Sequence, residues 1–240
     1  MRPLGWCHLG RLDYEVARRL QERCAVERIG ASVDDCLFTL EHPPVATLGR
    51  RATTDRERLL ADFFARREIP LVRTDRGGDV TYHGPGQLVI YPVVRLSSHG
   101  RAVRTFVEAL EAAMIDTASA FGFAATTRAD APGVFASSGA KLGSVGLAIR
   151  RGVTLHGASL NLDARAERGF AGFDPCGLAG VRATSLESET GVAGPACDVA
   201  ARVFARVLAA RLGRSLRPLD RDLGLHDLDP ARTTDDVACR

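Results

Sequence analysis

The sequence predicts an α/β protein of the α+β type, in which a mixed, mostly antiparallel sheet is flanked by helices. Three amphipathic stretches of helical length alternate with short apolar runs of strand length. Two of those runs, around residues 141–149 and 153–162, flank a short turn, which is typical of an antiparallel hairpin. A chain of 240 residues, of which 45% are apolar, can bury one large core.

The three predicted helices each have a recognisable start or end. The first follows the capping residue Asp13 and stops near Gly30. The second covers about residues 101–121, and the third runs from near residue 195 to 212; a glycine follows each. Their apolar stripes indicate core faces. Strands are expected in the apolar runs at residues 36–40, 69–74, 87–94, 141–149 and 153–162.

The remaining segments are predicted to be less regular. RGGDVTYHGPGQ (residues 76–87) is rich in glycine and proline, so we expect a loop with close backbone turns. We expect residues 1–212 to form a single domain. Residues 213–240 are Asp/Arg-rich and weakly patterned, and we expect them to form a weakly structured C-terminal tail.

Composition argues against several classes of function. The net charge of +3 is mild and the arginine pairs are not interleaved with aromatic residues, so nucleic acid is a poor candidate partner, although an acidic protein remains open. No apolar run reaches the ~18 residues that a membrane span needs. The N-terminal sequence lacks the apolar stretch of a signal peptide, so we expect a cytoplasmic protein.

The six cysteines lie far apart in the sequence. None forms a C-x-x-C pair or a Cys/His cluster with the spacing of zinc ligands, so we expect no metal. In a reducing compartment we expect all six to be free thiols. Most buried cysteines are simply small apolar residues, and a catalytic role needs further support.

One lysine stands apart from the other basic residues. Of the 32 lysines and arginines in the chain, only Lys141 is a lysine. Arginine holds its proton, whereas a lysine of lowered pKa can release one. On a regular strand Lys141 shares an apolar face with Val145, Leu147 and Ile149, and desolvation there is expected to lower its pKa. Lys141 is therefore a candidate acid and base.

Cys176 is the candidate nucleophile. The surrounding sequence FDPCGL is too interrupted for a helix or strand, so the thiol is expected on a loop, where reacting groups are often displayed. A nearby ammonium increases the thiolate fraction of a cysteine, and Lys141 is the natural source of that charge.

Three sequence blocks together resemble the octanoyltransferases, which are also called the lipoate-protein ligase B family. They are RGGDVTYHGPGQLVIYPV, GAKLGSVGLAIRRGVTLHGASLNL and FDPCGLAGVRATSL, and EHPPVATLGR resembles a fourth, earlier block. They occur in order over most of residues 36–190. The sequence differs from the family pattern at Ala46, where the family often has a larger aromatic residue. This difference affects the shape expected for the outer wall of the pocket.

The resemblance implies a fold, a reaction and partners. The fold is that of the biotin and lipoate protein ligases. The reaction transfers an octanoyl group from octanoyl-acyl carrier protein to a lysine of a lipoyl domain, without a cofactor. The implied acceptors are the lipoyl domains of 2-oxo acid dehydrogenase complexes and the glycine cleavage H protein.

The resemblance also assigns site residues by position. Cys176 forms the acyl-thioester and Lys141 serves it as acid and base. The residues expected to bind the substrate are Arg76, Gly77, Gly78, Asp79, Val80, Thr81, Tyr82, His83, Ser144, Val145, Gly146, Gly157, Ala158 and Ser159. Backbone N–H groups near Cys176 or at Gly77 and Gly78 are candidate oxyanion donors.

Two other functions stay open at this point. An ATP-dependent lipoate or biotin ligase of the same fold activates a free acid as an adenylate and has no need of Cys176. A non-catalytic acyl-carrier-binding protein needs neither Cys176 nor Lys141 for chemistry. A thiol hydrolase has less support, because His83 and His156 are more plausibly hydrogen-bonding residues of the pocket.

Overall fold

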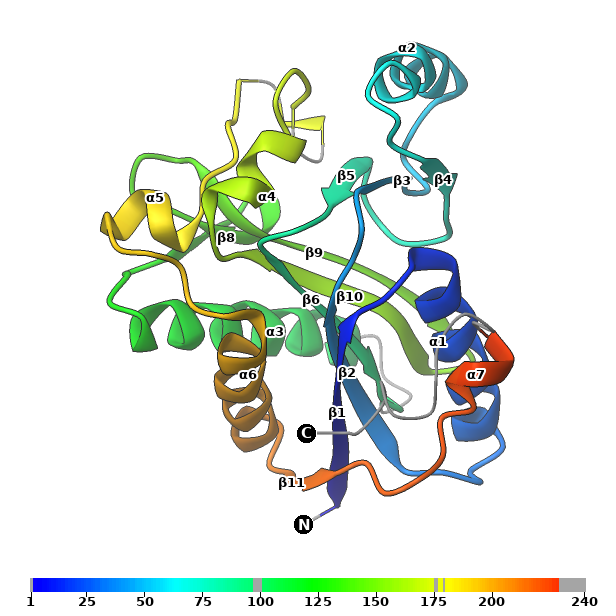
Figure 1. Ribbon diagram of the computed structural model, residues 1–240. Coiled ribbons are helices and arrows are strands. Elements are labelled where there is room, and N and C mark those ends of the chain that lie inside the picture. The colour runs from blue at the N-terminus through cyan, green and yellow to red at the C-terminus, as the bar shows by residue number, and fades with distance from the viewer. Residues whose placement is uncertain (1, 97–100, 175–176, 179, 229–240) are drawn as a thin grey trace.

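The computed structural model describes residues 2–96, 101–174, 177–178 and 180–228. Its strands form a main sheet in the order β11-β1-β2-β6-β10-β9-β8-β7 and a small sheet in the order β4-β3-β5 (Figure 1). In the main sheet β1 pairs in parallel with β11 and β2, and the other neighbours pair antiparallel. The predicted class, a mixed and mostly antiparallel sheet with flanking helices, is confirmed.

The strands are β1 (Pro3–Arg11), β2 (Asp35–Glu41), β3 (Val45–Leu48), β4 (Leu71–Arg73), β5 (Val80–His83), β6 (Gln87–Val93), β7 (Thr126–Arg128), β8 (Ala131–Phe135), β9 (Lys141–Arg150), β10 (Val153–Asn161) and β11 (Ser215–Pro218). The helices are α1 (Tyr14–Ile29), α2 (Thr54–Ala65), α3 (Arg101–Ala120), α4 (Ala164–Gly169), α5 (Leu186–Thr190), α6 (Cys197–Arg211) and α7 (Leu225–Leu228). None of the helices in the described residues is long and apolar enough to cross a bilayer.

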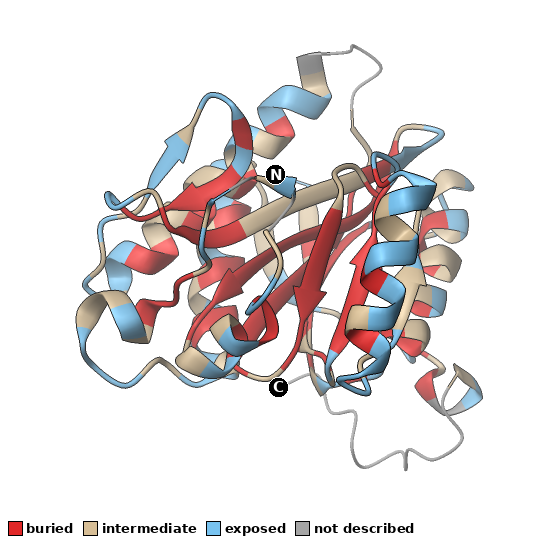
Figure 2. Ribbon diagram, turned by 90° about the horizontal axis from the view of Figure 1, so that it is seen from above, coloured by how far each residue is buried: buried red, intermediate tan, exposed pale blue. Residues whose placement is uncertain are grey.

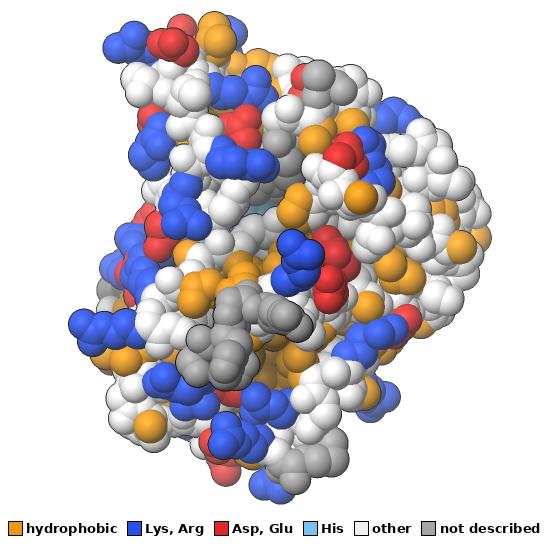
Figure 3. Space-filling view, turned by 180° about the vertical axis from the view of Figure 1, so that it is seen from behind, with side chains coloured by type: hydrophobic (Ala, Val, Ile, Leu, Met, Phe, Trp, Pro, Cys, Tyr) orange, Lys and Arg blue, Asp and Glu red, His pale blue; other side chains and the backbone are white. Residues whose placement is uncertain are grey.

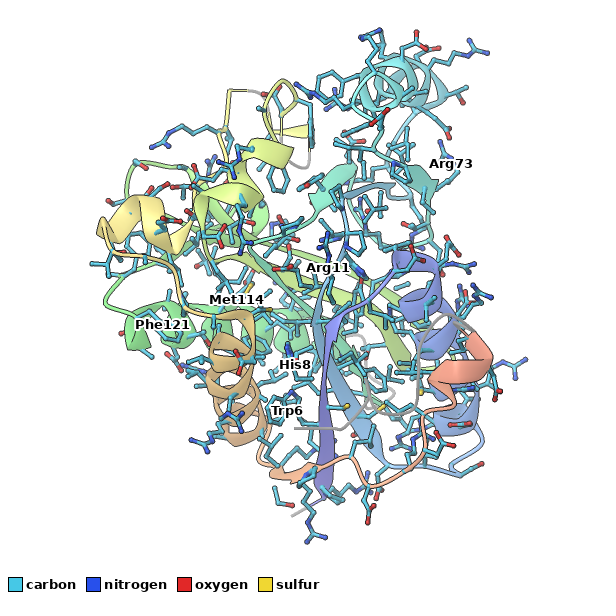
Figure 4. The ribbon with its side chains drawn as sticks, in the orientation of Figure 1. Trp6, His8, Arg11, Arg73, Met114 and Phe121 are labelled. Atoms are coloured by element: carbon cyan, nitrogen blue, oxygen red, sulfur yellow. The ribbon has the colours of Figure 1, made fainter. Side chains whose placement is uncertain are left out.

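Helices cover both faces of the main sheet. α3 and α6 pack against one face and α1 against the other, so that two apolar clusters lie on opposite sides of the strands (Figure 1). Met114 of α3 is fully buried in the first cluster, whereas Phe121 lies just beyond the end of that helix (Figure 4). Viewed from above, the central strands are buried between helices that expose their outer sides (Figure 2).

The three predicted helices are confirmed. Asp13 caps α1, because its Oδ1 accepts a hydrogen bond from the Glu15 N–H at 2.8 Å, and Gly30 is the C-cap. α3 ends two residues before Gly122, whose φ of 81° lies in the left-handed region that glycine adopts readily. α6 ends at Arg211, just before Gly213.

The predicted hairpin is also confirmed. Val153 pairs with Arg150, leaving Arg151 and Gly152 as a two-residue turn between β9 and β10. Both turn residues have positive φ, 48° and 79°, which matches the turn type that suits the twist of antiparallel strands.

The loop predicted over residues 76–87 is partly wrong. Its second half contains β5 (Val80–His83), which pairs with β3 in the small sheet. The glycines at both ends suggested a continuous loop, but V-T-Y-H has the β-branched and aromatic residues of a short strand. α2, which was not predicted, covers this small sheet through Leu60 and Phe64.

The C-terminal segment also differs from the prediction of a weakly structured tail beginning at residue 213. β11 extends the main sheet beside β1, and α7 follows it. Leu223 and Leu225 are buried with α1 in the second apolar cluster. This segment is ordered by long-range strand pairing and burial, which its short, charged sequence did not reveal. Residues 229–240 lie outside the described residues.

Candidate active site

A cavity of about 520 Å³ lies over β5, β9 and β10, with walls from β8 and from the N-terminal part of α3. Its volume is in the usual range for a small-molecule site. It opens on the face seen in Figure 3, where a hollow exposes histidine atoms and basic side chains gather along one side. Three segments far apart in the sequence, residues 76–83, 141–147 and 156–159, meet here.

The structure brings most of the predicted substrate-binding residues to this cavity. Arg76, Gly77, Gly78, Asp79, Thr81, His83, Ser144, Val145, Gly146, Gly157, Ala158 and Ser159 all line it.

Val80 and Tyr82 are the exceptions, because alternate side chains of β5 point to opposite faces. Val80 is buried in the cluster beneath α2, and the Tyr82 ring packs against Phe170 at 5.7 Å between centroids. Both residues therefore support the wall of the cavity from behind.

Arg76 shapes the first segment through hydrogen bonds to the protein itself. Its Nε donates to Thr47 Oγ1 at 3.0 Å, and its Nη2 donates to the carbonyls of Thr47 at 2.6 Å and Asp79 at 2.7 Å. The side chain is only 6% exposed. Arg76 thus folds residues 76–79 against β3, and its charge is spread over several acceptors.

Glycines allow the first segment to approach β9 and β3 closely. The Gly77 N–H donates to the Leu147 carbonyl at 2.9 Å. A Cβ at Gly146 would lie 3.1 Å from the Gly77 carbonyl, and one at Gly49 would lie 2.4 Å from the Gly78 carbonyl. Side chains at these positions would push the segment away from the cavity wall.

Lys141 begins β9 and is only 2% exposed. Its Nζ donates to the Pro132 carbonyl at 2.8 Å and lies 4.4 Å from the centre of the Phe135 ring. The side chain therefore reaches the cavity between β8 and β9.

The neighbours that the sequence predicted for Lys141 are only partly correct. Pairing between β8 and β9 shifts register, so that Gly143 faces Val134 but Lys141 faces Phe135. The extra residue interrupts the simple alternation that placed Lys141 with Val145, Leu147 and Ile149. Val145 and Leu147 do line the same cavity, whereas Ile149 is 38% exposed.

Main-chain hydrogen bonds join Lys141 to the segment that follows Cys176. The Lys141 N–H donates to the Arg182 carbonyl at 2.8 Å, and the Thr184 N–H donates to the Lys141 carbonyl at 2.9 Å. Cys176 itself lies outside the described residues. Gly177, the next residue in the sequence, lines the same cavity as Lys141.

A buried polar chain extends from His83 toward the same segment. His83 Nδ1 donates to Gln87 Oε1 at 2.6 Å, and Gln87 Nε2 donates to Asn161 Oδ1 at 2.9 Å. Asn161 Nδ2 then donates to the Thr184 carbonyl at 2.8 Å. Burial lowers the pKa of His83 to about 3, so this histidine is neutral at physiological pH.

His156 also lines the cavity. Its Nε2 lies 2.8 Å from Asp75 Oδ1, and burial is the main cause that lowers its pKa. Its φ of 56° is unusual for a residue other than glycine. Its hydrogen bond to Asp75 accords with the interpretation of this histidine as a pocket residue.

Sequence reasoning missed part of the lining. Val103 and Val107 of α3 were assigned to a core face, but they form an apolar wall of the cavity. Asp130, Ala131 and Pro132 precede or begin β8 and carried no motif. The only signal was the turn-like sequence ADAPG ahead of the lysine block.

The cysteines outside the site differ in state. Cys24, Cys36 and Cys197 are free thiols, but Cys7 is disulfide-bonded, so the expectation of six free thiols is wrong for Cys7. Among the described residues, no cluster of three or more histidine, cysteine or acidic side chains could hold a metal ion.

Comparison with known proteins decides the family. The sequence model of the lipoyl protein ligase A/B catalytic domain matches residues 13–209. The chain belongs to this family. The octanoyltransferase of Chloroflexus aggregans is 39% identical over 211 residues, which cover 87% of this chain and 95% of that protein. The octanoyltransferase of Alkalilimnicola ehrlichii is 44% identical over 179 residues, covering 75% and 79%.

Solved structures of low identity share the fold. A bipartite lipoate protein ligase of Thermoplasma acidophilum has a TM-score of 0.70 at 15% identity, with 95% of this chain and 91% of that chain covered. The biotin protein ligase of Aquifex aeolicus has a TM-score of 0.50 at 11% identity, covering 89% and 69%. The expected fold of biotin and lipoate protein ligases is confirmed. Because its relatives at 39% and 44% identity are named octanoyltransferases, the chain is an acyltransferase.

Proposed function

We propose that this protein transfers an octanoyl group from octanoyl-acyl carrier protein to the lysine amine of a lipoyl domain, through an acyl-thioester on Cys176. The observation that carries the proposal is the cavity shared by the buried Lys141 and by Gly177, which follows Cys176 in the sequence. The acceptors are the lipoyl domains of 2-oxo acid dehydrogenase complexes and the glycine cleavage H protein. We place the reaction in the cytoplasm.

In the first step the Cys176 thiolate attacks the carbonyl carbon of the octanoyl thioester. The bond between that carbon and the carrier sulfur breaks, and the Lys141 ammonium gives its proton to the departing thiolate. Cys176 is left acylated, the carrier leaves as a thiol, and Lys141 is left neutral.

In the second step the neutral amine of the acceptor lysine attacks the acyl-thioester on Cys176. The carbon–sulfur bond breaks, Cys176 leaves as a thiolate, and Lys141 takes the proton that the new amide nitrogen loses. Lys141 is again an ammonium and Cys176 again a thiolate, so the site is ready for the next donor.

The apolar wall of the cavity supports binding of the acyl chain. Val103, Val107, Val145 and Leu147 line it together with the polar groups of residues 76–83. Burial of about six methylenes at roughly 0.8 kcal/mol each contributes ~5 kcal/mol, so the chain accounts for much of the recognition.

The two glycines of the loop at residues 76–79 are candidate donors for the oxyanion. The Gly77 N–H is already bonded to the Leu147 carbonyl. We therefore assign the role to the Gly78 N–H, in a loop that Arg76 holds in place before substrate arrives.

An ATP-free assay separates this function from an ATP-dependent ligase. The protein is incubated with octanoyl-acyl carrier protein, and intact mass spectrometry is used to look for octanoylated Cys176; an apo lipoyl domain is then added. We expect acylation of Cys176 followed by transfer, both without ATP. Acceptor modification that requires ATP and a free acid would instead identify a ligase.

A non-catalytic acyl-carrier-binding protein would behave differently. It would bind octanoyl-acyl carrier protein equally well in wild type and in the Cys176→Ser variant, and neither would transfer the acyl group. We expect wild type to transfer it and Cys176→Ser to bind the carrier without transfer.

A further inference from the structure

One peptide group links a carboxylate to the lysine of the site. The carbonyl of Pro132 accepts a hydrogen bond from Lys141 Nζ at 2.8 Å. The N–H of the same peptide unit belongs to Gly133, and it donates to Glu111 Oε1 of α3 at 2.7 Å. Both distances are those of ordinary strong hydrogen bonds. Glu111 and Lys141 are thus connected through the Pro132–Gly133 peptide, with one partner at each end.

The backbone at Gly133 is specialised for this arrangement. Gly133 has a φ of 121°, which side chains of other residues rarely allow. A Cβ there would lie 2.3 Å from the Gly143 carbonyl and 3.0 Å from Lys141 Nζ. Only glycine therefore lets the peptide turn its carbonyl toward Lys141 while β8 stays close to β9.

We propose that Glu111 is a positioning residue for Lys141: its carboxylate orients the Pro132–Gly133 peptide so that the carbonyl of Pro132 accepts from the lysine ammonium. The arrangement favours the protonated lysine, because a carbonyl can accept from an ammonium and the carboxylate charge is attractive. Burial has the opposite effect. The balance lets Lys141 start as an acid and then serve as a base, so this inference rests on the proposed function.

Among the acidic side chains that the structure describes near Lys141, Glu111 is half-buried and interacts with the Lys141 charge. Asp130 also lies at the cavity, but it is exposed and engaged by Arg128, with 2.6 Å between Oδ2 and Nη2. Glu108, one turn earlier on α3, is exposed, whereas Glu111 is half-buried. Burial raises the pKa of Glu111, and the Gly133 N–H and the Lys141 charge oppose that rise.

Lys141 is the only lysine of the chain, which permits a direct test. In protein labelled with ¹³C and ¹⁵N lysine, a single side chain gives a signal, and its NMR titration reports the pKa of Lys141 without reference to activity. Glu111→Gln keeps the size and an oxygen that can accept from Gly133, but removes the charge. We expect the Lys141 pKa to fall by about half to one unit, less than the 1–3 units of a direct ion pair.

The kinetic readout should follow the titration. In Glu111→Gln, Lys141 should lose its proton at a lower pH, so the rate of Cys176 acylation should begin to fall at a lower pH. The alkaline limb of the pH–rate profile should therefore move by the same amount as the Lys141 pKa. Glu108→Gln is the matched control: it removes the same charge from the same helix and should leave both the titration and the limb in place.

Two results would overturn the role of Glu111. One is an unchanged Lys141 titration in Glu111→Gln, and the other is an equal shift in Glu108→Gln, which would indicate a general charge effect. Failure of the proposed function is a separate result, because wild type would then form no octanoyl-Cys176 whatever the titration shows. Circular dichroism at each pH confirms that the compared variants are folded.

Discussion

Replacing Lys141 by arginine separates the charge of this residue from its ability to release a proton. The guanidinium keeps a positive charge near the cavity, but it does not deprotonate in proteins. In the proposed mechanism Lys141 gives a proton in the first step and takes one in the second. Lys141→Arg should therefore impair both acylation of Cys176 and transfer to the lipoyl domain.

The size of the loss follows from the role and from the packing. Positioned acid–base groups contribute about 10²–10⁴-fold, so we expect a fall of at least about a hundredfold in each single-turnover rate. The side chain is only 2% exposed and Nζ is enclosed between the Pro132 carbonyl and the Phe135 ring. Because the guanidinium is larger than the ammonium, overpacking should also lower the free energy of unfolding by about 1–3 kcal/mol.

A second substitution separates chemistry from packing. Lys141→Met removes the charge and the proton but keeps an unbranched chain of similar length. Thermal melts and single-turnover acylation are measured for both variants, with octanoyl-Cys176 followed by mass spectrometry. If Lys141→Arg retained more than about a tenth of the wild-type rates, Lys141 would be only an electrostatic neighbour of Cys176.

Three further predictions concern stability. Burial lowers the pKa of His42 to about 4 and that of His83 to about 3, so the unfolded state binds more protons than the folded state below about pH 6.5. Urea unfolding should therefore show stability falling by roughly 2 kcal/mol per histidine from pH 7 to 5, and a flat profile would contradict these pKa values. Gly133→Ala should cost at least about 1–3 kcal/mol and slow acylation. Gly139 also has a positive φ, 83°, but a Cβ there would meet no atom within 4 Å, so Gly139→Ala should destabilise the protein less. If the two variants lost the same free energy of unfolding, backbone strain alone would explain the effect of Gly133→Ala. Leu223→Ala should lower the free energy of unfolding by about 2 kcal/mol or more, because Leu223 is only 4% exposed, and a change below about 0.5 kcal/mol would support a loosely held segment.

Local signals in the sequence were enough for the long elements. The first helix has a capping aspartate and a terminal glycine, and the β9–β10 hairpin has two strand-like runs separated by a short turn that ends in Gly152. These features act within a few residues of one another. They could therefore be predicted without knowledge of the rest of the fold.

Elements ordered by distant contacts were missed. β11 depends on pairing with β1, which is more than 200 residues away in the sequence. α2 buries only Leu60 and Phe64 on its inner side, so its apolar stripe is weak. The register shift at Lys141 depends on how β8 meets β9, and alternation along β9 alone could not reveal it.

The candidate site shows the same division. Residues 76–83, 144–146 and 157–159 were predicted from sequence blocks, and the fold brings nearly all of them to one cavity. The contacts of Lys141 with Pro132 and Phe135 were not predictable, since β8 has no motif of its own. The residues expected to take part in the chemistry could be predicted from the sequence, whereas the groups that contact and position Lys141 could not.

Hydrogen bonds from two sides explain why separated blocks form one site. The main chain of residues 182–184 brackets Lys141, bonding to its N–H and to its carbonyl. The chain of His83, Gln87 and Asn161 reaches the Thr184 carbonyl from the other direction. Movement of the segment after Cys176 would therefore break bonds to both β9 and β10. Such a rigid support is what a buried acid–base residue needs, because a small displacement greatly reduces its effect on rate.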